Sequence, residues 1–388
     1  MKGVAVRVAR LIGPFLGMML AGLAVTVVAA PVSAASTTRW VAKDGKAGPT
    51  SCDGTRKASK TIQGAIDAAK PGDTVVVCDG TYREALSISG VAKERLTVKA
   101  AKPGKAVLRT PSTIAGVLVG ITDTSTIAIA GLAVQVDTAA PCGRVTDAFL
   151  VSGSDHVALS GITIAPRGTA TLGTCGYEVG VHVTASDPVT VKSARITDFQ
   201  KNAVLEEGGS RLTVKTPTFR FLHAKAPAGS YCPEAMIRTA SSTLTVAGGT
   251  LSGMASAASS TPCASSGITA LSSPATVTGT TIRYVESGIV LTISGVHTLT
   301  DVTVTDGRGF YAGNGIDLRA ADATVTRAKV TRMAGMGISV SGSQYSHVVD
   351  GDFRGNTGYD CYEGPTGNEW TNDLGDDSLP VGLCTTPA

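Results

Sequence analysis

The sequence of 388 residues is poor in aromatic side chains, with two Trp, eight Tyr and seven Phe. Large aromatic rings supply much of the buried area of ordinary cores, so this chain must bury mainly small aliphatic and β-branched groups. That favours many thin, similar layers over two or three conventional domains. The 46 glycines have no period of three, which excludes collagen, and the hydrophobic fraction of 43% argues against disorder.

A strong net charge is also missing. The formal net charge is +4, and it falls to +1 without residues 1–34, which contain Lys2, Arg7 and Arg10 but no acid. A balance so close to neutral gives no indication of binding to nucleic acid or to an anionic membrane.

Residues 1–34 have the pattern of a secretory leader. They combine a basic start, an apolar stretch from Leu11 to about Val28 and the small-residue sequence Val32-Ser33-Ala34. This predicts a signal peptide, and an uncleaved anchor helix is the alternative. No later segment of the sequence approaches the roughly 18 apolar residues of a spanning helix. We therefore expect a secreted, extracellular protein without a membrane span after removal of the leader.

The rest of the sequence contains a repeat. A glycine or alanine followed by alternating apolar residues recurs at nine starts: Gly116, Ala148, Gly180, Ala203, Ala235, Gly267, Gly288, Gly315 and Gly337. Three later positions are apolar in every repeat, and in the first they are Val117, Ile127 and Leu132. Three inward rows predict a coil of three short strands that buries its core by stacking on its neighbours. The repeats differ in length only in the connection from the third apolar row to the next start. Insertions should therefore line one edge of the stack.

The eight cysteines of an exported chain fit a disulfide framework. Cys142 and Cys175 precede successive starts by similar distances, as do Cys232 and Cys263, so each pair should lie on adjacent coils within disulfide reach. The other four lie near the two ends. The predicted bridges are Cys52–Cys78, Cys142–Cys175, Cys232–Cys263 and Cys361–Cys384. Neither a C-x-x-C motif nor a nearby histidine pair occurs, so the sequence predicts no zinc site.

Both ends of such a stack need covers, because strand edges would otherwise stay unpaired. The segment 61–72 places Ile62, Ala65, Ile66 and Ala69 on one helical face, which predicts a short capping helix. The segment around Trp370, with its own cysteine pair, suggests an irregular C-terminal cap. The expected organisation is a signal peptide (1–34), an N-terminal segment with the capping helix (35–72), one domain of stacked coils (73–358) and the cap (359–388).

Both end segments carry recognisable motifs. Residues 61–82 read T-I-Q-G-A-I-D-A-A-K-P-G-D-T-V-V-V-C-D-G-T-Y, and residues 360–384 contain D-C-Y-E-G-P-T-G-N-E-W-T-N-D-L-G and P-V-G-L-C. The first resembles the opening, and the second the C-terminal cap, of secreted right-handed parallel β-helix proteins of the pectin lyase-like superfamily. The resemblance implies an all-β, single-stranded right-handed parallel β-helix of about nine to eleven coils with three strands each. It also implies a polysaccharide lyase-like ancestry.

In that superfamily the catalytic cleft usually follows the first strand of each coil. The expected outward row of this strand is Leu118, Leu150, His182, Leu205, Ile237, Thr269, Val290, Asp317 and Ser339. This row contains no Lys or Arg, whereas β-elimination from an acidic polysaccharide needs a base and cations that stabilise the intermediate. The N-T-D and G-H-G motifs of polygalacturonase-like chains are missing, as are W-x-D-H and R-x-P-x-x-R of calcium-dependent pectate lyase-like chains. A lyase with a lone Lys or Arg base needs none of these motifs.

Two groups of polar residues fall at short connections. The first should line a notch, where an acid, a lysine and a histidine could shuttle protons or bind a metal ion. Its candidate catalytic residues are Lys201, Asp198, His182 and Glu178. The second group would contact sugar through Arg283, Glu286, Asp306, Arg308 and Tyr311. Ordinary surface polarity is the alternative explanation for both groups.

Two charged residues interrupt an inward row. Glu206 and Arg238 lie three positions after successive starts, where most repeats have Val, Leu or Ala. With a constant strand phase they would form a stacked, buried ion pair. A local shift of phase would instead place both on the outer face, near Lys201.

The sequence thus favours an exported β-helix protein that acts on or binds extracellular or cell-surface polysaccharide, without a recognisable catalytic motif. A non-catalytic adhesion or envelope-scaffold protein is the alternative. No cofactor is evident, and calcium is expected only if the chain is a lyase. The five histidines disfavour a metal-handling role. The expected partner is a polysaccharide or a cell-envelope component, with no nucleic acid, and the protein is expected to be a monomer.

Overall fold

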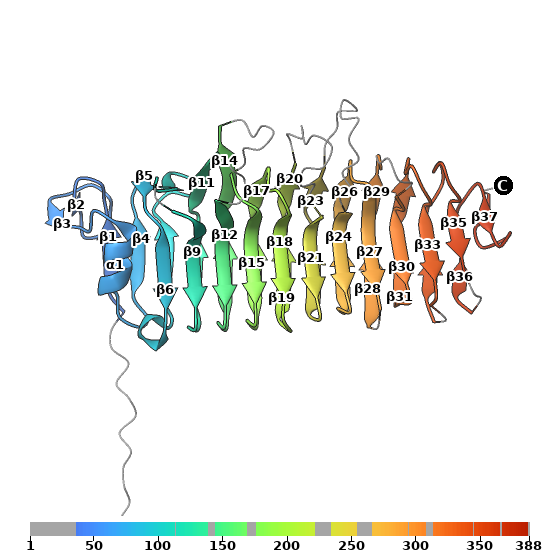
Figure 1. The fold of residues 1–388 in the computed structure, drawn as a ribbon, viewed down its shortest axis with the longest axis horizontal. Helices are drawn as coiled ribbons and strands as arrows, with labels where there is room; N and C mark the ends of the chain where they lie inside the picture. Colours follow the sequence, from blue (N-terminus) through green and yellow to red (C-terminus); the bar gives the residue numbers. More distant parts are fainter. Residues whose placement is uncertain are drawn as a thin grey trace, which may run out of the picture. The chain divides into compact units, whose positions relative to one another are not determined.

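A computed structural model describes residues 36–112, 114–138, 144–168, 176–221, 234–253, 266–293, 295–307, 313–343, 345–364 and 367–386. In these ranges the chain winds through three long parallel β-sheets (Figure 1). Each strand pairs with the equivalent strand of the next coil, and one coil supplies one strand to each sheet. The fold is an all-β, right-handed parallel β-helix, as expected. No helix in the described ranges is long and apolar enough to cross a membrane.

The sheets are numbered by the order in which a coil visits them. Sheet 1 contains β6 (Leu86–Ser89), β9 (Gly116–Thr122), β12 (Val145–Ser152), β15 (Val179–Thr184), β18 (Asn202–Glu207), β21 (Ala235–Ala240), β24 (Ser266–Leu271), β27 (Ser287–Thr292), β30 (Ile316–Arg319), β33 (Ile338–Ser341), β35 (Cys361–Glu363) and β37 (Ser378–Leu379). Sheet 2 contains β1 (Thr38–Val41), β4 (Thr74–Val77), β7 (Thr97–Ala100), β10 (Ala128–Ala130), β13 (Val157–Ser160), β16 (Val189–Lys192), β19 (Arg211–Lys215), β22 (Thr243–Ala247), β25 (Ala275–Thr278), β28 (Val296–Thr300), β31 (Asp322–Thr326), β34 (His347–Val349) and β36 (Glu369–Thr371). Sheet 3 contains β5 (Gly80–Arg83), β8 (Ala106–Arg109), β11 (Ala133–Asp137), β14 (Thr163–Arg167), β17 (Arg195–Thr197), β20 (Thr218–Arg220), β23 (Thr250–Ser252), β26 (Thr281–Arg283), β29 (Thr303–Thr305) and β32 (Lys329–Thr331).

From the second predicted coil onward the predicted inward rows form one continuous core, except that Ile237 takes the place predicted for Met236 in β21. In sheet 2, Leu159, Val191 and Val214 pair in succession, and all three are fully buried. In sheet 3, Ile196 pairs with Phe219 in the same way. Because every coil adds the same thin aliphatic layer, the long chain needs few aromatic side chains.

The predicted register is wrong in the first coil. Val119, and not Val117, pairs with Phe149 of the next coil. The other two rows are shifted by the same two residues, to Ile129 and Val134. Residues 117–119 are apolar at every position, so alternation alone does not fix which of them point inward.

Small residues at the coil starts have a steric cause. A Cβ atom added at Gly267, Gly288 or Gly315 would lie 2.7, 2.3 or 2.7 Å from a backbone oxygen of the following coil. Real Cβ atoms keep at least 3.0 Å from such atoms. At these three starts the backbones of successive coils therefore approach too closely for a Cβ atom.

A ladder of serines lines the corner between sheets 1 and 2. Each hydroxyl accepts a hydrogen bond from a backbone N–H of the preceding coil at 3.0 to 3.3 Å. The members of this serine ladder are Ser154, Ser186, Ser210, Ser242 and Ser273, all buried. A buried turn leaves backbone donors that need such partners. Serine recurs here six or seven residues after the coil start, a signal that the apolar periodicity does not contain.

The predicted N-terminal helix is confirmed as α1 (Ile62–Ala68), which buries Ile62 and Ile66. The Thr61 hydroxyl caps it by accepting the N–H of Gly64 at 3.2 Å. Glu84 accepts the N–H groups of Ile62 and Gln63 at 2.8 and 2.9 Å. The free donors of the first turn are thus satisfied. Two smaller elements flank the helix: the hairpin of β2 (Lys46–Ala47) and β3 (Arg56–Lys57), and the 3-10 turn η1 (Val91–Lys93).

Two of the four predicted disulfides are confirmed. Cys52 is bonded to Cys78, and Cys361 to Cys384, with Cα–Cα distances of 5.5 and 6.1 Å. The predicted bridges Cys142–Cys175 and Cys232–Cys263 lie outside the described residues.

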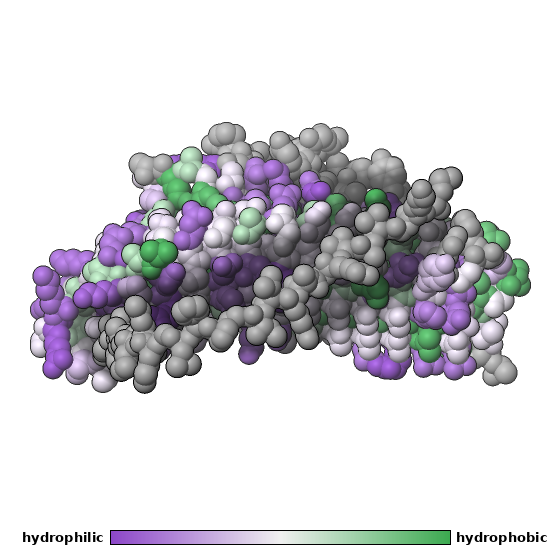
Figure 2. Space-filling view, turned by 90° about the horizontal axis from the view of Figure 1, so that it is seen from below, coloured by the Kyte–Doolittle hydropathy of each residue, from purple (hydrophilic) through white to green (hydrophobic). Residues whose placement is uncertain are grey.

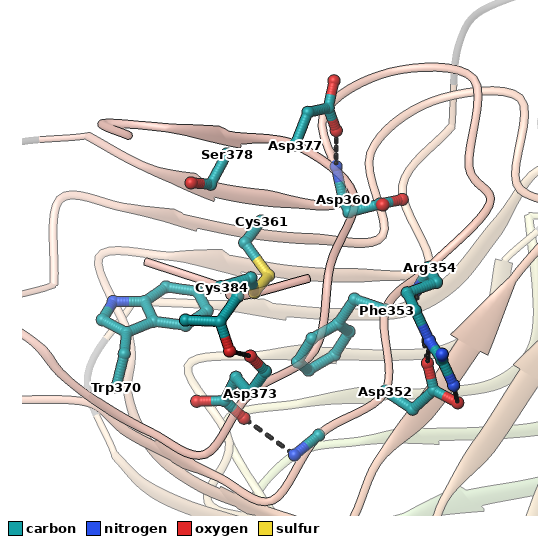
Figure 3. The surroundings of a disulfide bond; sticks show 12 residues. Asp352, Phe353, Arg354, Asp360, Cys361, Trp370, Asp373, Asp377, Ser378 and Cys384 are labelled. Carbon is teal, nitrogen blue, oxygen red and sulfur yellow. Dashed lines mark hydrogen bonds and ion pairs between the residues drawn. A yellow bond between two sulfur atoms is a disulfide. The ribbon is translucent and has the colours of Figure 1, made fainter. Parts of the chain in front are cut away.

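The C-terminal segment continues the coils, whereas an irregular cap was expected. Strands β35, β36 and β37 extend sheets 1 and 2 in parallel register. Figure 3 shows Phe353, Trp370 and Asp373 around the Cys361–Cys384 disulfide.

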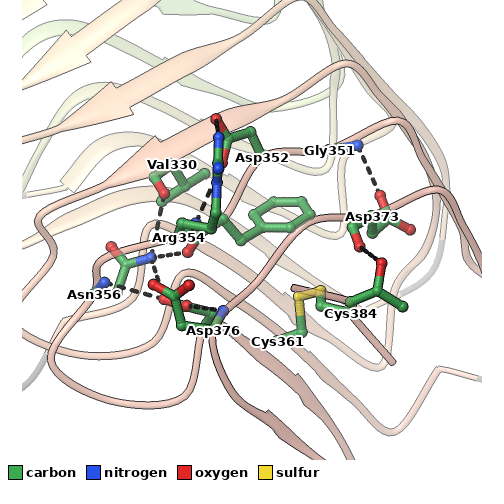
Figure 4. A network of polar contacts seen from close by, with 12 residues as sticks. Val330, Gly351, Asp352, Arg354, Asn356, Cys361, Asp373, Asp376 and Cys384 are labelled. Carbon is green, nitrogen blue, oxygen red and sulfur yellow. Dashed lines mark hydrogen bonds and ion pairs between the residues drawn. A yellow bond between two sulfur atoms is a disulfide. The ribbon is translucent and has the colours of Figure 1, made fainter. Parts of the chain in front are cut away.

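Buried carboxylates tie the loops of this segment together (Figure 4). Asp360 accepts the N–H groups of Asn356 and Asp376 at 3.0 and 2.7 Å. Asp373 accepts the N–H of Gly351 at 2.7 Å, and burial raises the pKa of Asp373 to about 6. Backbone donors that would stay unsatisfied at the end of the stack thus find charged acceptors.

The outward residues of the coils are mostly polar. Figure 2 shows hydrophilic side chains over much of one face, with hydrophobic residues only in separate groups.

Candidate functional site

Sheet 1 carries one outward row of side chains along its length. From β9 to β33 this row is Gly120, Leu150, His182, Leu205, Arg238, Thr269, Val290, Asp317 and Ser339. Seven of the nine predicted positions are confirmed, and Leu118 and Ile237 are wrong. The correction at β21 matters for chemistry, because it places a guanidinium group in a row that was expected to lack one.

The predicted stacking of Glu206 on Arg238 is also wrong. In β21, Ile237 pairs with Val204 and points inward, so Arg238 lies beside Leu205 on the outer face. Thr239 stacks on Glu206 inside the coil, and both are fully buried. A shift of one residue reverses the face of every side chain in a strand. The expected phase shift therefore occurs, but it moves only Arg238 outward.

His182 connects three successive coils. Its Nδ1 lies 3.0 Å from Oδ1 of Asp147 on β12, and its Nε2 lies 3.7 Å from Oε2 of Glu207 on β18. The Thr146 hydroxyl donates to the other oxygen of Asp147 at 2.8 Å and helps to orient this carboxylate. The hydrogen bond that the imidazole donates to Asp147 raises the pKa of His182, against an opposing effect of burial. An imidazole held in this way can take up and release a proton near neutral pH.

Two ion pairs flank His182. Lys201 Nζ lies 2.7 Å from Oε2 of Glu178, which confirms that these two predicted residues meet. On the next coil Arg238 forms an ion pair with Glu234, four residues earlier. The N–H of Glu234 donates to the carbonyl oxygen of Lys201 at 3.0 Å, so the two ion pairs sit on directly joined backbone segments.

Asp198 does not belong to this surface. It lies in the turn after β17, is buried with 7% of its area exposed, and has a positive φ of 55°. Its neighbour is Tyr177, whose pKa is raised first by burial and then by the charge of Asp198.

The second predicted group is only partly described, because Arg308 and Tyr311 lie outside the described residues. Asp306 accepts hydrogen bonds from Nε and Nη2 of Arg332 at 2.7 and 3.1 Å. Arg283 lies 5.5 Å from the centre of the Tyr284 ring, and Glu286 is buried. The fork-like pairing of Asp306 with Arg332 was not predicted, although the two residues lie one coil apart at equivalent positions. It engages both oxygens of the carboxylate and favours a structural role for Asp306.

A metal centre is not apparent. Among the described residues, no group of three or more His, Cys, Asp and Glu side chains could hold a metal ion. Asp147, His182, Glu207 and Arg238 supply one polar group on each of four successive coils of sheet 1. We call these four residues the polar strip.

No protein-family model and no curated protein sequence matches the chain. Solved structures do match. Pectin methylesterase from Erwinia chrysanthemi is 14% identical over 63% of this chain and 78% of its own, with a TM-score of 0.43. The family 28 exopolygalacturonase of Yersinia enterocolitica is 11% identical over 91% and 79%, with a TM-score of 0.40.

A third match is the catalytic unit of the GH87 α-1,3-glucanase from Streptomyces thermodiastaticus, 16% identical over 91% of this chain and 67% of its own, with a TM-score of 0.43. The end motifs had indicated a parallel β-helix, and the strand pairing of the chain establishes its coils. Likeness at such identities concerns the fold alone, so function has to be argued from the polar strip.

Proposed function

We propose that the protein binds an extracellular or cell-surface polysaccharide along the polar strip of sheet 1. The observation that supports this is that His182, Glu207 and Arg238 lie on the outer faces of β15, β18 and β21, with the mostly buried Asp147 of β12 in contact with His182. Neighbouring parallel strands lie about 4.8 Å apart, so the strip offers a polar group at each step along the stack. An extended glycan lying along the coils would meet these groups in turn.

The strip suits sugar hydroxyls, which both donate and accept hydrogen bonds. Carboxylates accept only and guanidinium groups donate only, so a row that contains both can engage each side of a hydroxyl group. Leu205 lies between His182 and Arg238 and provides a small apolar patch for a ring face. None of the nine residues in the described outward row is aromatic, so recognition depends on hydrogen bonds and charge more than on ring stacking.

A reaction on the bound glycan is the second candidate, and the Asp147–His182 hydrogen bond favours it. A histidine oriented by a carboxylate can protonate a leaving oxygen or accept a proton from the sugar. Glu207 faces the other ring nitrogen, which is the one directed away from Asp147. His182 is the residue that we assign to proton transfer if turnover is found.

Binding should be lost when the strip is disrupted. We expect His182→Ala and Arg238→Ala each to weaken binding to the preferred glycan at least about tenfold. The reason is that a polar group of the bound sugar would stay buried without its hydrogen-bond partner on the protein. The measurement is affinity electrophoresis or calorimetry against a panel of neutral glucans and polyuronates. Arg211→Ala is the matched control, because Arg211 forms a similar exposed ion pair with Asp187 at 2.8 Å on sheet 2.

The same panel separates binding from catalysis. Unsaturated or shortened products that disappear in His182→Ala would establish a reaction, and calcium can be added or chelated in parallel. Binding without products would favour the adhesion or scaffold role. Equal binding by wild type and both strip variants would refute the assignment of the site.

A further inference from the structure

Charge is unevenly distributed along the coils. Residues 36–112 contain fourteen Lys and Arg against seven Asp and Glu, whereas residues 345–386 contain one Arg against eight Asp and Glu. The near-neutral total thus hides a basic N-terminal end. Fields of this kind raise the local concentration of oppositely charged ligands.

A pocket of about 370 Å³ lies within the basic end, beside the capping helix. Four cationic residues line it: Lys43, Lys60, Arg83 and Arg109. Its size falls in the range of small-ligand sites, from about 300 to 1,000 Å³. The wall also includes the side chains of Thr61 and Thr81, whose hydroxyl groups can donate hydrogen bonds.

The stems of the two lysines lie beside glycines. A Cβ atom added at Gly45 would lie 2.9 Å from Cε of Lys60, and one added at Gly80 would lie 3.1 Å from Cγ of Lys43. The Lys43 ammonium group lies 5.4 Å from the centre of the Tyr82 ring. Both lysines are exposed, so a ligand can reach them.

The two arginines are anchored from behind. Arg109 donates to both oxygens of Asp137 at 3.0 and 3.1 Å, and Arg83 lies 3.7 Å from the same carboxylate. Arg167 also approaches Asp137, at 3.4 Å, so three guanidinium groups share one negative charge.

The remaining acid of the pocket, Glu84, is engaged by the backbone N–H groups of Ile62 and Gln63. In the described part of the chain, neither Lys43 nor Lys60 forms an ion pair with a carboxylate. The lining itself holds four cations and one carboxylate, Glu84. Asp44, Asp79 and Asp137 lie nearby, and two of these carboxylates also pair with cations outside the pocket, Asp79 with Lys102 and Asp137 with Arg167. Positive charge therefore remains available for a ligand.

We propose that this pocket binds an anionic group, a carboxylate or a phosphate carried by an extracellular polymer. The four cations and two threonines supply several hydrogen-bond donors to one pocket, and the basic end attracts the polymer toward it. The site lies among β1 to β8, on other coils than the polar strip of β12 to β21, and it does not depend on the function proposed for that strip.

The test is titration of the full-length protein with oligogalacturonate and, separately, with pyrophosphate at low and high salt. We expect one of the two probes to bind, with an affinity that Lys43→Gln/Lys60→Gln lowers at least tenfold. Lys57→Gln/Lys99→Gln removes the same charge from the same end outside the pocket, and it should change the affinity less than twofold. Pyrophosphate has no sugar hydroxyl groups for the polar strip, so its binding reports on the pocket alone. Thermal unfolding of each variant checks that the fold is intact.

Three results would overturn the proposal. Equal losses in the two double variants would mean that a diffuse field, and not the pocket, attracts the anion. No binding of either probe would remove the site. Concentration-dependent association of the protein that Lys43→Gln/Lys60→Gln abolishes would mean that the basic end receives the acidic C-terminal segment of a second copy.

Discussion

Gly288→Ala should lower the free energy of unfolding by about 3 kcal/mol or more, at the upper end of what overpacking costs. The new methyl group would lie 2.3 Å from the carbonyl oxygen of Gly315 and 2.4 Å from Cγ1 of Val304. That oxygen already accepts the N–H of Ile289 at 2.9 Å, so moving it away breaks the pairing between coils. Chemical denaturation followed by circular dichroism measures the change.

Gly120→Ala is the matched control for this effect. Gly120 lies in the same sheet, and its added Cβ would have no neighbour closer than 3.9 Å. We expect a change within about 0.5 kcal/mol, and a small gain is possible because alanine restricts the unfolded chain. If both variants unfold at the same denaturant concentration, the coils do not approach each other closely at Gly288.

Glu206→Val should stabilise the protein at pH 8 by about 1 to 4 kcal/mol. Glu206 lies inside the coil between Val183 and Thr239 and is fully buried. One of its oxygens accepts the N–H of Ser210 at 3.2 Å, and the other has no hydrogen bond of ordinary geometry within the described residues. Valine would continue the apolar row without a buried charge.

The gain should depend on pH in a defined direction. Burial raises the pKa of Glu206, opposed by hydrogen bonds from Ser242 and Ser210. The folded protein therefore holds this proton more tightly than the unfolded chain does. No penalty exists below the ordinary carboxyl value of 4.5, and it grows as the pH rises toward the raised pKa of the folded state. The stabilisation by valine should thus disappear near pH 4.

Glu207→Gln is the control for the pH effect. Glu207 is the next residue of β18, but it points outward, with 52% of its side chain exposed. Its replacement should change stability little at any pH. A gain from Glu206→Val that is equal at pH 4 and pH 8 would contradict a charge penalty, and a loss of stability at pH 8 would mean that Glu206 makes a favourable buried contact.

Most of the fold could be predicted because each coil repeats the same demand for inward aliphatic groups. The alternation of inward and outward residues was assigned wrongly at Val117 and again at Met236. Both lie in runs of consecutive apolar residues. In such a run either face of a strand can be assigned to the core, and only pairing with the next coil decides. The serine ladder was not predicted, because its members accept hydrogen bonds from backbone N–H groups and the periodicity of apolar residues contains no signal for such contacts.

The site was predictable to a lesser degree. The meeting of Lys201 with Glu178 follows from their positions on successive coils. Asp147 was missed because it comes before the coil start, where the apolar pattern does not indicate which way a side chain points. Arg238 was assigned to the interior by the same error of phase that placed Met236 in the inward row.

The most direct test of the proposed function is hydroxyl-radical footprinting of the protein with and without the glycan that it binds. The polar strip predicts protection of side chains in residues 145–152, 179–184, 202–207 and 235–240, on the outer face of sheet 1. Sheet 2 of the same coils should remain equally reactive. Protection confined to the basic N-terminal end, or spread evenly over all three sheets, would contradict a polysaccharide site on the polar strip.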